Sequence, residues 1–122
     1  MSPLILIVDD EFGLAEVIGE LLRDEGYRTA LAPNGKLGLA KLAEERPALV
    51  LLDVMMPVLD GPSMLRAIRA DPAYTDLPVV MMTSLPDYGA SGPATPYQGL
   101  LRKPFPPEAL LSIVRRFAPL GP

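Results

Sequence analysis

The sequence predicts an α/β fold, with an open, five-stranded parallel sheet and helices on both faces. Short apolar runs recur five times along the chain, and segments with apolar residues at helical spacing follow four of them. Each connection is long enough for the right-handed crossover that joins parallel strands. With 122 residues, of which 49% are hydrophobic, the chain suits a single domain, residues 1–122, with one core.

The first two strand–helix units lie near the N-terminus. Leu4–Val8 is a continuous apolar run, as expected of a strand covered on both faces, and Tyr27–Ala32 predicts the second strand. The helix between them stops at Gly26, and a second helix, capped by Asn34, ends before Pro47. Their expected core faces comprise Leu14, Val17, Ile18, Leu21 and Leu22 in the first helix, and Leu39, Leu42 and Ala43 in the second. This spacing is typical of amphipathic helices.

The remaining units are less regular, because one of them lacks a helical pattern. Ala48–Val54 predicts the third strand, and Pro62 fits the first turn of the helix after it. The run VVMMTS after Pro78 predicts the fourth strand, and Gly99–Arg102 predicts a short fifth strand. The expected core faces comprise Met64, Leu65 and Ile68 in the third helix, and Leu110, Leu111, Val114 and Phe117 in a last helix that opens at Pro106 and Pro107. Leu85–Gln98 stands where a fourth helix is expected, but its three prolines and two glycines predict a loop.

The composition of the chain excludes several kinds of chemistry. The chain contains neither Cys nor His, which excludes disulfides, thiol nucleophiles, imidazole bases and Cys- or His-ligated zinc. Carboxylates remain, and they favour hard cations such as Mg²⁺ or Ca²⁺. A net charge of −4 argues against direct binding of nucleic acid. Because there is no 18-residue apolar run and no basic leader, we expect a soluble, cytoplasmic protein without membrane insertion.

Polar residues end the predicted strands at the edge where open parallel sheets bind ligands. These residues are Asp9 and Asp10 after the first strand, Asp53 in the third, Thr83 and Ser84 in the fourth, and Lys103 after the fifth. Singly, each has an ordinary structural explanation: an acidic pair caps a helix, a hydroxyl satisfies a turn, and a lysine stays in solvent. Together, three carboxylates outweigh one ammonium, and a divalent cation is the simplest compensation. The pattern therefore indicates a Mg²⁺ site, and Mg²⁺ in turn indicates a phosphoryl group.

The motifs ILIVDDE, LLDVMMPVLDG, PVVMMTS and RKPF resemble, in order and separation, those of the receiver domains of two-component response regulators. The resemblance covers nearly the whole chain, and Asp60–Gly61 matches the family's turn before the third helix. It implies the flavodoxin-like strand order 2-1-3-4-5 of the chemotaxis regulators.

The resemblance also implies roles for individual residues. Asp53 would accept a phosphoryl group, Thr83 would hydrogen-bond to it, Lys103 would pair with it, and the Lys103–Pro104 bond would be cis. The implied Mg²⁺ ligands are Asp9, Asp10, Asp53 and the backbone carbonyl of Met55. The donor would be a sensor histidine kinase or a histidine phosphotransfer protein, and the output would pass to an unknown downstream protein. Such a domain would not be a conventional enzyme, because it would act only on itself. It would catalyse its own phosphorylation, from phosphohistidine or an acyl phosphate, and a slow autodephosphorylation.

Other classes of protein are weighed against this one. A haloacid-dehalogenase-like phosphatase also uses an Asp nucleophile with Mg²⁺, but it needs a second Asp where this chain has Met55. A nucleotide-binding flavodoxin-like domain needs a glycine-rich phosphate loop, which does not follow the first strand. An atypical receiver, acting as a phosphorylation-independent protein-binding module, stays open as the alternative. The acidic set and Lys103 argue against it, and the degenerate fourth unit argues for it.

Leu100 departs from the family pattern, which often has Tyr or Phe three residues before the lysine. A leucine has no polar tip that could exchange hydrogen bonds when a phosphoryl group binds. We therefore expect Leu85–Gln98 to be an irregular, mobile loop that phosphorylation orders or displaces through Thr83.

Overall fold

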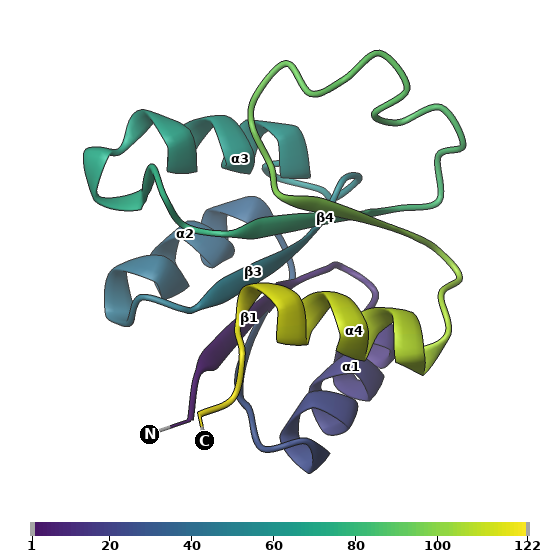
Figure 1. Cartoon of the computed structure of the whole chain (residues 1–122). Coiled ribbons are helices and arrows are strands. Elements are labelled where there is room, and N and C mark those ends of the chain that lie inside the picture. The colour runs from purple at the N-terminus through teal and green to yellow at the C-terminus, as the bar shows by residue number, and fades with distance from the viewer. Residues whose placement is uncertain (1, 122) are drawn as a thin grey trace.

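The computed structural model describes residues 2–121. In these residues strands alternate with helices except between the last two strands, as the sequence predicts (Figure 1). The strands are β1 (Leu4–Val8), β2 (Arg28–Ala32), β3 (Leu49–Asp53), β4 (Val79–Thr83) and β5 (Gly99–Arg102). The helices are α1 (Phe12–Asp24), α2 (Gly35–Glu44), α3 (Gly61–Ala70) and α4 (Pro107–Phe117), with a short 3₁₀ turn, η1 (Pro72–Tyr74), before β4.

The five strands form one parallel sheet in the order β2-β1-β3-β4-β5, which confirms the expected fold class. Val8 of β1 lies opposite Leu52 of β3, and Asp53 lies opposite Met82 of β4. Thr83, at the end of β4, lies opposite Arg102 of β5. The carboxyl ends of these strands therefore meet at one edge of the sheet.

The core lies on both faces of this sheet. Helices α1 and α4 cover one face, and α2 and α3 cover the other (Figure 1). Successive strand residues point to opposite faces. The face under α1 and α4 buries Ile5, Ile7, Leu49, Leu51, Val80 and Met82 against Ile18, Leu22, Leu110 and Val114. The other face buries Leu6, Val8, Val50, Leu52, Val79 and Met81 against Leu42, Met64, Leu65 and Ile68.

Two residues expected in the core face solvent. Val17 of α1 is 53% exposed, and Ala43 of α2 is also exposed. The buried stripe of α1 instead comprises Ala15, Ile18, Gly19 and Leu22, and that of α2 comprises Gly35, Gly38 and Leu42. Small residues thus make up part of each buried stripe, and Val17 and Ala43 lie on the exposed sides of their helices. Leu14, Leu21, Leu39, Leu111 and Phe117 are half-buried at the margins of the core.

Two helices begin with the side-chain caps that their sequences favour. Asn34 accepts a hydrogen bond from the backbone N–H of Leu37 at 2.9 Å, as predicted. Asp60 accepts one from the N–H of Ser63 at 2.8 Å at the start of α3. Hydrogen bonding by the side chain of Ser63, and then by its backbone N–H, holds the pKa of the Asp60 carboxyl below its usual value.

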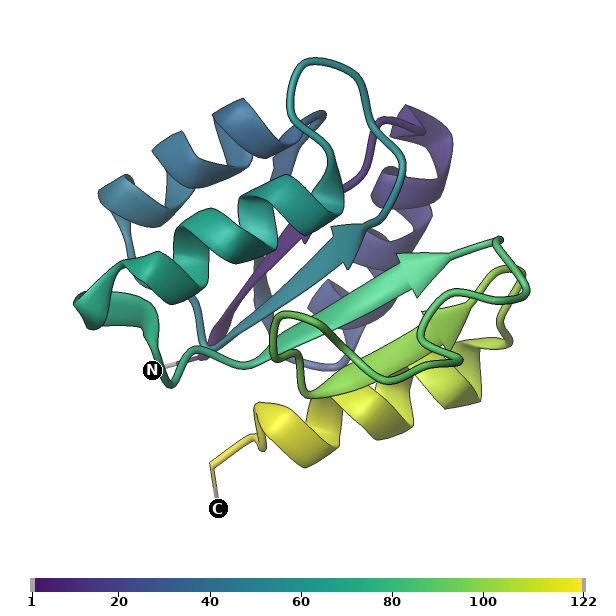
Figure 2. The same cartoon turned by 90° about the horizontal axis from the view of Figure 1, so that it is seen from above.

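The segment Leu85–Gln98 is a chain of turns with no helix, which confirms the predicted loop. It lies in the same layer as α2 and α3 (Figures 1 and 2), and its tyrosines pack against the core cluster of that face. Arg69 of α3 donates hydrogen bonds to the carbonyl of Pro96 and the side chain of Gln98, both at 2.9 Å. The loop is thus tied to α3 at its C-terminal end, and its mobility stays a prediction.

Across residues 2–121, none of the helices combines the length and the apolar character needed to cross a membrane.

Candidate functional site

Three carboxylates meet at the carboxyl edge of the sheet. Asp9 and Asp10 follow β1, and Asp53 is the last residue of β3. One carboxylate oxygen from each lies within 4.8 Å of the others. Asp9 and Asp53 are buried, whereas Asp10 is exposed. The cluster is therefore fixed on one side and open to solvent on the other.

The acidic residues after β1 do not act as side-chain caps of α1. Glu11 is the residue before the helix, and its side chain makes no capping hydrogen bond. The Asp9 carboxylate accepts a hydrogen bond from the N–H of Glu11 at 2.9 Å, which fixes the turn between strand and helix. Helix capping therefore does not account for the acidic cluster.

Asp53 is held in an environment that disfavours its charge. Its side chain is 9% exposed. Burial, and then the negative charge of Asp9, raise the pKa of the Asp53 carboxyl from 3.8 to about 6, although Lys103 acts in the opposite direction. A cation placed beside Asp53 would stabilise its ionised form.

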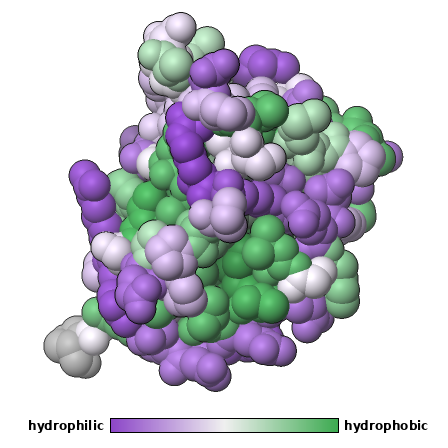
Figure 3. All heavy atoms as spheres, turned by 90° about the vertical axis from the view of Figure 1, so that its right-hand side faces the viewer, coloured by the Kyte–Doolittle hydropathy of each residue, from purple (hydrophilic) through white to green (hydrophobic). Residues whose placement is uncertain are grey.

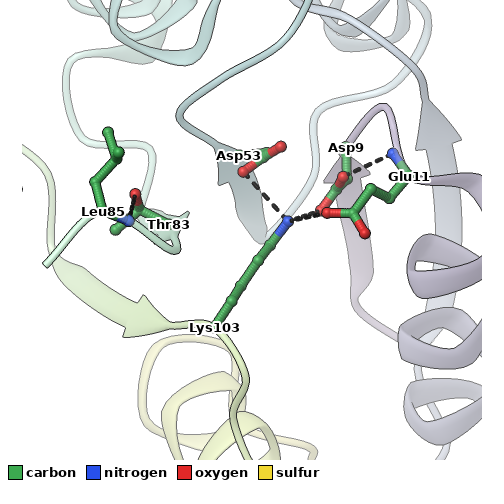
Figure 4. A network of polar contacts seen from close by, with 6 residues as sticks. All are labelled: Asp9, Glu11, Asp53, Thr83, Leu85 and Lys103. Carbon is green, nitrogen blue, oxygen red and sulfur yellow. Dashed lines mark hydrogen bonds and ion pairs between the residues drawn. The ribbon is translucent and has the colours of Figure 1, made fainter.

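Lys103 connects the strand ends (Figure 4). Its Nζ lies 2.8 Å from a carboxylate oxygen of Asp9, 3.2 Å from one of Glu11 and 3.3 Å from one of Asp53. Burial of the ammonium lowers its pKa, but the hydrogen bond and charge of Asp9, with the charge of Asp53, outweigh burial and raise the pKa above its ordinary value. Lys103 is therefore a fixed positive charge beside Asp53. The Lys103–Pro104 peptide bond is cis, as the resemblance implies.

A pocket of about 230 Å³ opens above these residues. It is lined by Asp10, Glu11, Asp53, Met55, Thr83, Ser84 and Lys103. Thr83 is buried, and its hydroxyl oxygen accepts a hydrogen bond from the N–H of Leu85 at 3.0 Å. The pocket thus brings together the residues singled out from the sequence except Asp9, which contacts it through its ion pair with Lys103.

Two further residues make contacts around this site and were not singled out from the sequence: Glu11 lines the pocket, and Arg102 lies outside it. Glu11 contacts Lys103, and its place in the acidic run Asp9–Glu11 was a usable signal. Arg102 holds the carbonyls of Leu85 and Tyr88. Arg102 is the first residue of the motif RKPF, but the motif gave it no role, because its contacts depend on the path of the loop.

The fold and the site define a doubly wound α/β protein with a carboxylate-rich pocket at the carboxyl edge of its sheet. Residues 5–115 match the family model described as the response regulator receiver domain. The chain therefore belongs to the receiver domain family of two-component response regulators.

Relatives and solved structures agree with this assignment. The DNA-binding response regulator MtrA of Mycolicibacterium paratuberculosis is 39% identical over 120 residues, which cover 94% of this chain and 51% of that protein. The chain thus spans about half the length of such curated relatives.

Among solved structures, chemotaxis protein CheY4 of Vibrio cholerae is 33% identical, with a TM-score of 0.88, and the match covers 96% of this chain and 99% of that one. The receiver domain of sensor histidine kinase PA1611 from Pseudomonas aeruginosa is 29% identical, with a TM-score of 0.88, and covers 97% of this chain and 98% of that one. That structure has a magnesium ion coordinated in its active site cleft.

Proposed function

We propose that this chain is a Mg²⁺-dependent phosphoacceptor that a partner histidine kinase, or a histidine phosphotransfer protein, phosphorylates on Asp53. The observation that carries the proposal is the position of Asp53 at the end of a buried strand, 3.3 Å from Lys103 and beside the acidic pair. Carboxylate nucleophiles of this kind form acyl phosphates.

The proposed reaction needs a nucleophile, charge stabilisation and little else. A carboxylate oxygen of Asp53 attacks the phosphorus of a phosphohistidine on the partner. The phosphorus–nitrogen bond breaks, its electron pair stays on the donor imidazole, and Asp53 becomes an acyl phosphate. The ammonium of Lys103 pairs with one phosphoryl oxygen, and the hydroxyl of Thr83 donates to another. Later attack by water on phosphorus returns Asp53 and releases inorganic phosphate, which is the slow autodephosphorylation.

The oxygen donors in the pocket fit a divalent cation. They are carboxylates, which hard cations prefer, and their separation of at most 4.8 Å suits joint ligation of one ion. Asp10 would hold Mg²⁺ directly, Asp9 would assist, and Asp53 and the backbone carbonyl of Met55 would complete the protein ligands. When bound, Mg²⁺ would neutralise charge on the transferred phosphoryl group. The magnesium in the receiver of PA1611 supports this part of the proposal.

The surface beside the pocket suits a protein donor. A hollow of about 420 Å³ adjoins it, lined by Glu11, Leu14, Ser84, Lys103, Pro104 and Phe105. Figure 3 shows the molecule from the right-hand side of Figure 1, and on this side hydrophobic side chains (green) lie next to hydrophilic ones (purple). The donor histidine lies outside residues 1–122, because these contain no His.

Phosphorylation is tested by incubating the protein with Mg²⁺ and a small acyl phosphate, with intact mass as the readout. We expect the wild type to gain one phosphoryl group, and Asp53→Asn to gain none. Asp24→Asn, which changes an exposed carboxylate at the end of α1, serves as the matched control and should behave like the wild type. Peptide mapping that places the phosphate on Ser84 would contradict the assignment. A folded wild-type protein that gains no mass would favour the phosphorylation-independent binding module.

We further propose that residues 1–122 act as a single cytoplasmic receiver domain that makes no direct contact with nucleic acid. Its net charge of −4 supports this proposal, because DNA binders present a basic surface. An electrophoretic mobility assay with this chain alone should show no shift of duplex DNA at any salt concentration. A shift that disappears as salt is added would contradict it.

A further inference from the structure

We propose that Arg102 transmits the phosphorylation state of Asp53 from Thr83 to the loop Leu85–Gln98. This proposal rests on the proposed function and adds the route by which the signal leaves the site. Arg102 is on β5, directly opposite Thr83 of β4. One of its terminal nitrogens donates a hydrogen bond to the carbonyl of Leu85, and the other donates to the carbonyl of Tyr88, both at 2.7 Å. We call these four residues, Thr83, Leu85, Tyr88 and Arg102, the arginine strap.

The strap begins at the hydroxyl that would bind the phosphoryl group. The Thr83 hydroxyl oxygen accepts a hydrogen bond from the N–H of Leu85 at 3.0 Å (Figure 4). When Thr83 reorients to donate to a phosphoryl oxygen on Asp53, its bond to Leu85 must either break or draw Leu85 along. The first outcome leaves Leu85 held less firmly, and the second moves its carbonyl relative to Arg102.

A guanidinium group that binds two carbonyls couples their positions, because the group is rigid. It is planar, and its two terminal nitrogens have a fixed separation. Because both nitrogens hold backbone carbonyls, Leu85 and Tyr88 are tied to one rigid group. A displacement of Leu85 therefore shifts Tyr88 or costs one of the two hydrogen bonds of Arg102.

The loop has room to respond. A cavity of about 270 Å³ lies between it and α3, lined by Leu65 and Arg66 of the helix and by Tyr88 and Tyr97 of the loop, among others. Gly89 and Gly92 have φ angles of 81° and 84°, a backbone conformation that glycine adopts without strain. The first half of the loop can thus move, and Tyr88 is the side chain whose packing on the core would change.

The other end of the loop is fixed, which gives the movement a direction. Arg69 holds the carbonyl of Pro96, and the N–H of Gln98 donates to the carbonyl of Val79 at 2.8 Å. Tyr97 stacks on Tyr88 with ring centroids 6.1 Å apart. We therefore expect a hinged shift of residues 85–92 against a fixed 96–98 segment, with the tyrosine stack as the part that changes.

Leu100 is consistent with this route. A Cβ placed on Gly89 would lie 3.5 Å from a methyl carbon of Leu100, so this leucine is a neighbour of the loop near its tip. It has no polar atom to exchange hydrogen bonds. In this chain Arg102, rather than the residue at position 100, makes the polar contact between β5 and the loop.

The test compares hydrogen exchange in the wild type, Arg102→Ala and Arg66→Ala, each with and without beryllofluoride and Mg²⁺. Tyr88, Ala90 and Gly92 donate backbone hydrogen bonds within the loop, so their amides report on it. In the free protein, Arg102→Ala should speed their exchange by about tenfold or more, since each bond that it removes involves a charged donor. Arg66 lines the cavity but donates only within its own helix, to Ser63, so Arg66→Ala is the matched control and should match the wild type.

Adding beryllofluoride should change the exchange rates of these amides in the wild type and in Arg66→Ala. It should leave their exchange rates in Arg102→Ala unchanged. Arg102→Ala should still gain a phosphoryl group at the wild-type rate. Three outcomes would contradict the proposal. The first is that the loop amides of free Arg102→Ala exchange as slowly as those of the wild type. The others are that beryllofluoride changes exchange in Arg102→Ala as much as in the wild type, or that it leaves exchange in the wild type unchanged. If the wild type gains no phosphate, the proposed function fails, whereas the free-protein comparison still decides whether Arg102 holds the loop.

Discussion

Asp53 combines two properties that a phosphoacceptor needs and that ordinarily conflict. It is buried at the end of β3, where a charge is costly, and it must be ionised to act as a nucleophile. Lys103 supplies one positive charge, but Asp9 shares that charge. Burial, and then the negative charge of Asp9, raise the pKa of Asp53 to about 6, because without a further cation Lys103 does not compensate for both.

This imbalance predicts how stability depends on pH without Mg²⁺. The pKa of Asp53 is about 6 in the folded protein and 3.8 for an ordinary Asp, so the folded state binds more protons than the unfolded state between these values. The contribution of Asp53 to the free energy of unfolding should therefore fall as pH rises from about 4 to about 6, by about 3 kcal/mol.

Asp53→Asn should remove this dependence, because the amide stays neutral. Urea denaturation at about pH 4 and about pH 7.5 measures it as the difference between the variant and the wild type, since other carboxylates titrate equally in both. The variant should gain stability relative to the wild type at the higher pH. If the two proteins differed in free energy of unfolding by the same amount at both pH values, ionisation of Asp53 would not destabilise the folded state.

At the scale of elements, glycines place the helices where the site needs them. A Cβ on Gly61, the first residue of α3, would lie 2.1 Å from the backbone oxygen of Asp53 and 2.9 Å from the Cα of Val54. The N–H of Gly61 also donates to the carbonyl of Val54 at 2.9 Å. The helix can therefore start directly against the end of β3 only if this residue has no side chain.

Gly61→Ala should be destabilising by more than about 2 kcal/mol, because the clash is with backbone that no rotamer change can relieve. The same substitution at Gly13 of α1, where a Cβ would meet nothing within 4 Å, is the matched control. Gly13→Ala should be neutral or stabilising by up to about 1 kcal/mol, as Ala is the better helix former. Thermal or urea denaturation compares the two, and equal effects would mean that the junction tolerates a side chain.

The positions of the strands and helices could be predicted from the sequence, but the direction of some helix faces could not. Strand and helix positions followed from hydrophobic periodicity, and the loop Leu85–Gln98 followed from its prolines and glycines. The outward direction of Val17 did not follow, because the period of a helix does not say which of two adjacent stripes is closer to the sheet. Gly38 decides this for α2, where a Cβ would lie 2.8 Å from the methyl carbon of Met64. Hydropathy gives little weight to such a residue.

The candidate site was easier to predict than the packing of the helices. Parallel strands bring their carboxyl ends to one edge whatever the details of the core, so Asp9, Asp53 and Lys103 had to converge once the strands were placed. The contacts of Arg102 could not be predicted in this way. They depend on the route of an irregular segment, which no periodic pattern encodes.

For the whole molecule, Lys103 joins parts of the chain that are distant in sequence. Its side chain extends from the end of β5 and forms ion pairs with Asp9, which follows β1, and with Asp53 on β3. The side chain of Asp9 is fully buried, and that of Lys103 is 12% exposed. Removal of one partner from such a pair leaves a buried charge without compensation, which typically costs about 3–5 kcal/mol.

Lys103 and Mg²⁺ would neutralise the same carboxylates, and this predicts how they act together on stability. The wild type should be stabilised by Mg²⁺, by about 2.7 kcal/mol at a hundredfold excess over the dissociation constant. Lys103→Ala should lose several kcal/mol without metal and regain more from Mg²⁺ than the wild type does, because the cation no longer competes with an ammonium for Asp9 and Asp53. Asp10→Ala should lose most of the metal effect.

Thermal melts with and without millimolar Mg²⁺ measure these shifts, and Lys41→Ala is the matched control. Lys41 pairs with Glu44 on the exposed surface of α2, so its loss should cost less than about 0.5 kcal/mol and leave the response to Mg²⁺ unchanged. A wild-type melt that is indifferent to Mg²⁺ would count against the metal site itself. A smaller Mg²⁺ shift in Lys103→Ala than in the wild type would instead mean that the lysine helps to hold the metal-binding geometry, because the loss of order would then outweigh the relief of competition.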